Sequence, residues 1–113
     1  MLVGTECYLA LLRALLGDSP ENRERAADEC TDLVGAYEPE QETTLLHVLL
    51  WSAEVETSAN AMESELNAVS AIVSARSPSS KISTLLSRID RSQLSGSAVE
   101  HYDYLVGEAD RTD

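Results

Sequence analysis

The chain has 113 residues, 43% hydrophobic and 25% charged, which predicts one folded domain over residues 1–113 and excludes wholesale disorder. Its 20 acidic and 8 basic residues give a formal net charge of −12, which argues against binding to nucleic acid or to an anionic membrane surface. Aromatic residues make up only 4%, with no Phe, so we expect a core of Leu, Val, Ile and Ala, which favours helices.

The first predicted helix spans about residues 5–16, with Thr5 as its cap. Its apolar side chains form a wide face, which indicates that neighbouring helices cover most of it. These side chains are Tyr8, Leu9, Leu11, Leu12, Leu15 and Leu16. Gly17 is expected to end the helix in a left-handed conformation, which Gly adopts without a Cβ penalty.

The second predicted helix spans about residues 20–36, with Ser19 as its N-cap and Pro20 at its first position. Small residues lead its inner face, so it can pack closely against the first helix. This inner face consists of Ala26, Ala27, Cys30, Leu33, Val34 and Tyr37. The outer row consists of Glu24, Asp28 and Asp32, which stand four residues apart.

The third and fourth predicted helices span residue 39 to about 52–54 and about residues 59–75, with Ser58 or Asn60 capping the latter. Leucine and valine between residues 45 and 50 form the apolar side of the third helix, with His47 and Trp51 on its flank. The inward positions of the fourth helix are Met62, Leu66, Val69, Ile72 and Val73. Its other side carries Glu56, Asn60, Glu63, Asn67 and Ser70.

A turn-rich break over residues 76–80 precedes a fifth helix, predicted for about residues 80–89. The charge reverses here, because the stretch from Arg76 to Arg91 has four basic residues and one acid. The sixth helix spans about residues 97–108, after which the chain is expected to fray. Its inward positions are Val99, Tyr102, Leu105 and Val106, and Glu100, Tyr104 and Glu108 line up outward.

No segment alternates as a strand would, so the sequence predicts an all-α protein of six helices in three antiparallel pairs. The pairs cover roughly residues 5–36, 39–75 and 80–108, a period of roughly 40 residues. Five residues open the second helix of the first pair in a D-x-P-x-x-R-x-x-A-A pattern: Asp18, Pro20, Arg23, Ala26 and Ala27. This pattern resembles the second-helix signature of HEAT repeats, which implies a HEAT-like α-α superhelix. The second pair departs from it, with no Pro and with Glu63 or Glu65 where the Arg would stand.

In such a stack the second helix of each pair lines one face, so the outward rows are expected to lie side by side. A contiguous face of like charge can dock an oppositely charged partner. The candidate partner-binding residues are Glu24, Asp28, Asp32, Trp51, Glu56, Asn60, Glu63, Asn67, Glu100, Tyr104 and Glu108. Trp51, Tyr104 and Tyr37 are the candidate aromatic anchors. The alternative interpretation is that the rows are ordinary solvated helix faces, with Trp51 and Tyr37 at the edge of the core.

No catalytic, metal-binding or cofactor-binding motif stands out, so we do not expect an enzyme. His47 and His101 have no Cys or second His at ligand spacing, and no Gly-rich loop cradles a phosphate. Cys7 and Cys30 are interpreted as buried free thiols, with a disulfide left open. The N-terminus does not resemble a signal peptide and no run approaches the roughly 20 apolar residues of a membrane span, so we expect a cytoplasmic protein.

The segment ESELNAVSAI, residues 63–72, together with the small size and the acidity, resembles HEAT-like immunity proteins of bacterial polymorphic-toxin and contact-dependent inhibition systems. This resemblance implies a cytoplasmic protein that binds a cognate toxin domain, often a basic nuclease, and blocks its active site. An acidic face would suit such a partner. Two alternatives are a general HEAT-type adaptor or scaffold and a fragment of a longer array. The chain is expected to be a monomer, or a weak dimer if its basic stretch meets the acidic face of another copy.

Overall fold

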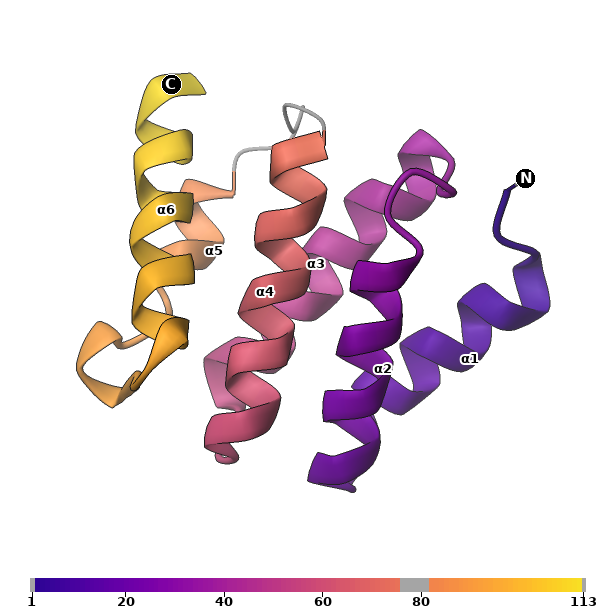
Figure 1. The fold of residues 1–113 in the computed structure, drawn as a ribbon, viewed down its shortest axis with the longest axis horizontal. Helices are drawn as coiled ribbons and strands as arrows, with labels where there is room; N and C mark the ends of the chain where they lie inside the picture. Colours follow the sequence, from indigo (N-terminus) through magenta and orange to yellow (C-terminus); the bar gives the residue numbers. More distant parts are fainter. Residues whose placement is uncertain (1, 76–81, 113) are drawn as a thin grey trace.

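The computed structural model describes residues 2–75 and 82–112, and all regular structure in these ranges is helical (Figure 1). The helices are α1 (Thr5–Leu15), α2 (Pro20–Asp32), α3 (Pro39–Val55), α4 (Ala59–Ala75), α5 (Ser83–Leu86) and α6 (Ser97–Thr112), with a short 3-10 helix η1 (Arg91–Gln93). The predicted turn at residues 76–80 and the residue Lys81 lie outside the described residues. The all-α class is confirmed.

The helices form two layers, with α2, α4 and α6 side by side in one and α1, α3 and α5 behind them (Figure 1). Helix α4 is central, because it packs against α2, α3 and α6, and the α2–α4 contact is the most extensive in the fold. The principal extents are 36 × 31 × 19 Å. The shortest of them is about two helix diameters, as two layers require.

Short polar side chains fix where the helices begin. The Oγ of Ser19 accepts a hydrogen bond from the N–H of Asn22 at 3.2 Å, directly before Pro20, as predicted. Ser58, rather than Asn60, caps α4 by accepting from the N–H of Ala61 at 3.2 Å. The prediction for Thr5 is wrong, because Gly4 occupies the cap position of α1 without a side-chain bond.

The core is aliphatic, and both α2 and α4 contribute small residues to it. Ala26 and Ala27 of α2 and Ala61 and Ala68 of α4 are all buried. The larger core side chains include Leu15, Tyr37, Leu45, Leu49, Leu50, Leu66, Ile72, Leu86 and Leu105. Five inward positions predicted for α4 are confirmed as buried: Met62, Leu66, Val69, Ile72 and Val73.

Several boundaries and burial predictions are corrected. Helix α2 ends at Asp32 rather than near residue 36, the described part of the fifth helix is only Ser83–Leu86, and α6 continues to Thr112. Continued packing explains the last difference, because Ala109 is buried. No other helix of the described residues covers the side of α1 that carries Cys7 and Leu9, so both residues are exposed. Ser70, predicted to face outward, is buried.

The glycine prediction is also corrected, because the glycines with positive φ in the described residues are Gly35 and Gly96, and not Gly17. Gly35 has φ +97°, in the turn between α2 and α3, whereas Gly17 has no positive φ. The carbonyl of Gly17 instead accepts a hydrogen bond from Nη1 of Arg23 at 2.8 Å. Gly17 therefore contributes to the contact between α2 and the end of α1.

Replacing Gly35 with Ala should destabilise the fold by about 1–2 kcal/mol, because an L side chain is disfavoured at positive φ. The matched control is Gly107→Ala, at an exposed helical position where a Cβ would meet no atom within 4 Å. That change should stabilise the fold by about 0.5–1 kcal/mol, since Ala is the better helix former. Urea denaturation of both variants measures the difference, and equal effects would contradict the backbone explanation.

Candidate functional site

The outward rows of α2, α4 and α6 are the candidate site, and together we call them the acidic face. Its residues are Glu24, Asp28 and Asp32 on α2, Asn60, Glu63 and Asn67 on α4, and Glu100, Tyr104 and Glu108 on α6. Glu24, Asn67 and Glu108 are half-buried and the other six are exposed.

Two contacts show that the rows of α4 and α6 meet. The hydroxyl groups of Ser74 and Tyr104 are 2.9 Å apart, in an exposed hydrogen bond between the two helices. At the other end of the row, a Cβ on Gly96 would lie 3.7 Å from Oε2 of Glu63. The α6 row therefore adjoins the outward row of α4, which lies beside α2 (Figure 1).

The acids of the α2 row form no ion pairs among the described residues, although Arg25 lines the same shallow surface pocket as Glu24 and Asp28. In the described part of the chain, no hydrogen bond or ion pair joins Glu24, Asp28 or Asp32 to another side chain. Two basic residues flank Glu24 in the sequence: Arg25 donates to the amide oxygen of Asn22 at 3.4 Å, and Arg23 pairs with Glu56. Like charges four residues apart on a helix repel by a few tenths of a kcal/mol, so this row slightly destabilises α2.

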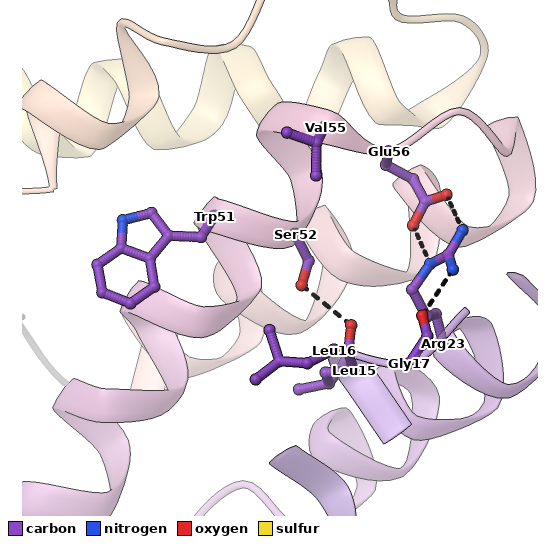
Figure 2. A pocket seen from close by; sticks show the side chains of 8 residues that line it. All are labelled: Leu15, Leu16, Gly17, Arg23, Trp51, Ser52, Val55 and Glu56. Carbon is purple, nitrogen blue, oxygen red and sulfur yellow. Dashed lines mark hydrogen bonds and ion pairs between the residues drawn. The ribbon is translucent and has the colours of Figure 1, made fainter. Parts of the chain in front are cut away.

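Two predicted site residues, Trp51 and Glu56, lie apart from this face and line a pocket of about 240 Å³ (Figure 2). The pocket is lined by Leu15, Leu16, Gly17, Arg23, Trp51, Ser52, Val55 and Glu56. Its apolar mouth consists of Leu16, Trp51 and Val55, with exposed fractions of 64%, 47% and 76%. The prediction that Leu16 would be covered is therefore wrong. The ring of His47 packs edge-on against Trp51, with centroids 5.6 Å apart.

The polar end of the pocket is an ion pair between α2 and the residue that follows α3. Nε and Nη2 of Arg23 donate to Oε1 and Oε2 of Glu56, both at 2.8 Å (Figure 2). Oε2 of Glu56 also accepts from the backbone N–H groups of Thr57 and Ser58. The Glu56 side chain is 0% exposed and that of Arg23 only 14%. Glu56 thus holds two segments of the chain together, and its carboxylate is not presented to solvent.

These hydrogen bonds lower the pKa of Glu56. Burial acts to raise its pKa, but the hydrogen bonds from Arg23 and the backbone outweigh burial and lower the pKa to about 2. Glu56 is therefore ionised at neutral pH.

The sequence interpretation missed Glu65, which is 0% exposed in the middle of α4. Among the described residues, neither of its carboxyl oxygens has a hydrogen-bond donor. Burial raises the pKa of Glu65 to about 9, and the nearby Glu56 carboxylate acts in the same direction, while Arg23 opposes them. The spacing could have revealed it, because residue 65 continues the buried line through Ala61, Ala68 and Ile72.

The remaining reactive groups are structural or isolated. Tyr37 is fully buried and donates its hydroxyl to the carbonyl of Cys30 at 2.9 Å, so it is not a surface anchor. Burial raises the pKa of Cys30 to about 12, so its thiol is not a nucleophile. Cys7, expected to be buried, is an exposed free thiol.

In the parts of the chain that the structure describes, no three His, Cys, Asp or Glu side chains are grouped so that they could hold a metal ion. Within the same ranges, no helix combines the length and apolar character needed to cross a membrane. Compared with known protein families, curated proteins and solved structures, the chain matches none of them.

Proposed function

We propose that the protein is a binding module that docks a cationic protein domain on its acidic face. The observation that carries this proposal is the α2 row, where Glu24, Asp28 and Asp32 form no ion pair with another described residue, on a helix that packs beside α4. With a net charge of −12 behind it, such a face attracts a basic partner and speeds its association. Tyr104, exposed on the same face, offers an aromatic contact.

The partner class that we favour is a basic toxin domain whose active site the protein covers, which makes this chain an immunity protein. A cationic cleft that binds phosphate would be complementary to a row of carboxylates. The associated architecture is a short HEAT-like superhelix of three antiparallel pairs. The packing of α1 on α2, α3 on α4 and α5 on α6 supports that arrangement, as does the side-by-side layer of α2, α4 and α6.

The first test is whether the reading frame that precedes the gene of this chain encodes a basic domain, because a metabolic neighbour would overturn the toxin partner. Binding to such a domain is then measured by calorimetry and by rescue of growth. The variant Glu24→Lys/Asp28→Lys/Asp32→Lys should weaken binding about 10- to 100-fold, or ~1.4–2.8 kcal/mol. The reversal turns attraction into repulsion at the contact, so the loss should be largest at low salt.

The matched control is Glu6→Lys/Glu40→Lys/Glu54→Lys, which changes the net charge equally but lies on exposed positions of α1 and α3. It should weaken binding only slightly. Unchanged binding of the α2 variant at physiological salt would overturn the proposal. Equal losses in both variants would show that overall charge, rather than the acidic face, attracts the partner.

A second candidate function, a general adaptor, is favoured by the pocket of Figure 2. Leu16, Trp51 and Val55 leave an apolar mouth that could take an apolar side chain of any partner, whatever its charge. Trp51→Ala would then weaken binding more than reversal of the α2 row, and salt would have little effect on affinity.

A further inference from the structure

The buried centre beneath the pocket contains two carboxyl groups and one guanidinium. Arg23 uses all three guanidinium nitrogens, because Nε and Nη2 donate to Glu56 and Nη1 donates to the carbonyl of Gly17. Glu65 is left without a donor, although it is fully covered. A second buried carboxylate would therefore carry an uncompensated charge, which is among the most costly states in a protein interior.

Among the described charged groups around Glu65, only Glu56 can serve as its hydrogen-bond partner. Arg23 on α2 and Glu56 at the end of α3 both interact electrostatically with Glu65, whereas Asp18, in the turn before α2, acts on Arg23. From α6, the hydroxyl of Tyr104 bonds Ser74 of α4, and Gly96, just before α6, lies near Glu63; neither contact involves Glu65. Glu56 can only accept hydrogen bonds. Its Oε2 accepts three and its Oε1 only one, from Arg23, so Oε1 has a lone pair available for a further donor.

We propose that Glu65 carries a proton in the folded protein and donates it to the Glu56 carboxylate. The hydrogen bonds from Arg23 to Glu56 and from Glu65 to Glu56 then link α2, the α3–α4 turn and α4. Folding becomes a step that takes up a proton, so the folded state gains stability as the pH falls through the neutral range. This pH-sensitive device is independent of any partner.

The direction of the pH dependence follows from the pKa of Glu65 in the folded and the unfolded protein. The pKa of Glu65 is 4.5 in its ordinary environment and about 9 in the folded protein, so folding takes up a proton between these values. The unfolding equilibrium constant therefore rises about tenfold per pH unit from about pH 5 to about pH 9. Below that window both states are protonated, and above it both are ionised. Glu56, with its lowered pKa, stabilises the fold above about pH 4.5 and loses that effect in stronger acid.

The experiment compares urea denaturation of the full chain and its Glu65→Gln variant from pH 5 to pH 9. Gln is always neutral and its amide can donate to Glu56. The ratio of the unfolding constants, wild type over variant, should rise about tenfold per pH unit across this window. Glu63→Gln, at an exposed position on the same helix, is the matched control and should leave the pH profile of the wild type unchanged.

A second measurement does not depend on the variant folding. The infrared spectrum of the wild-type protein at pH 7 should contain the carbonyl band of a protonated carboxylic acid, and this band should disappear above about pH 10. Parallel pH profiles for wild type and Glu65→Gln would overturn the proposal. So would the absence of that carbonyl band at pH 7.

Discussion

Replacing Arg23 with Met should reduce the free energy of unfolding by about 3–5 kcal/mol. The change removes two hydrogen bonds at 2.8 Å and leaves Glu56 buried without its cation. It also removes the bond from Arg23 to the carbonyl of Gly17, at the end of α1. The loss therefore arises mainly from an uncompensated buried charge. Urea denaturation at pH 7 measures it.

The chain contains a close geometric match to this ion pair in an exposed setting. Nε and Nη2 of Arg91 donate to the carboxylate of Asp103 at 2.9 and 2.8 Å, but the two side chains are 56% and 52% exposed. Arg91→Met should therefore reduce stability much less than Arg23→Met does, because solvent screens the exposed pair. Similar losses for Arg23→Met and Arg91→Met would show that burial does not set the strength of the pair.

A double variant separates the charge from the packing. Arg23→Met/Glu56→Gln removes both charges while keeping side chains of similar length, and its amide oxygen can still accept from Thr57 and Ser58. It should recover much of the stability lost in Arg23→Met, because no buried charge remains unpaired.

The second large effect is expected at Leu66, in the middle of the central helix α4. Leu66 is 0% exposed, and α4 packs against α2, α3 and α6. Leu66→Ala should cost about 2–5 kcal/mol, because the surrounding helices relax only partly around the cavity. The loss should appear as a lower denaturation midpoint with an unchanged slope.

The control for this prediction is Val55→Ala at the mouth of the pocket, where Val55 is 76% exposed. It should change stability by less than about 0.5 kcal/mol. A small loss at Leu66 would indicate that α4 is less tightly enclosed than the structure shows.

Features that depend on neighbouring residues were predictable from the sequence. Ser19 and Pro20 define the start of α2 through one hydrogen bond and one fixed φ. The bounds of α4, Ala59–Ala75, are confirmed because an apolar stripe of helical period lies between two breaks. The all-α class follows from the same periodicity.

Features that depend on which distant segments meet were not predictable. Arg23 and Glu56 are 33 residues apart, and the local pattern that contains Arg23 does not name its partner. Glu56 was therefore placed in an outward row with Asn60, although it pairs across the fold. In the sequence Glu65 is only a departure from the repeat pattern, because its role depends on Arg23 and Glu56, which the fold brings near it. The exposure of Leu16 depends similarly on where α3 crosses the end of α1.

Trp51 gives the molecule an optical property. It is the sole tryptophan of the chain, so the indole emission of the protein originates entirely at the mouth of the pocket in Figure 2. An apolar group seated there would displace water from the ring and shift the emission to shorter wavelengths. A partner that contacts only α2, α4 and α6 would leave the ring in water and the spectrum unchanged. The emission wavelength of Trp51 therefore distinguishes a partner bound at the pocket from one bound on the acidic face, without an added label.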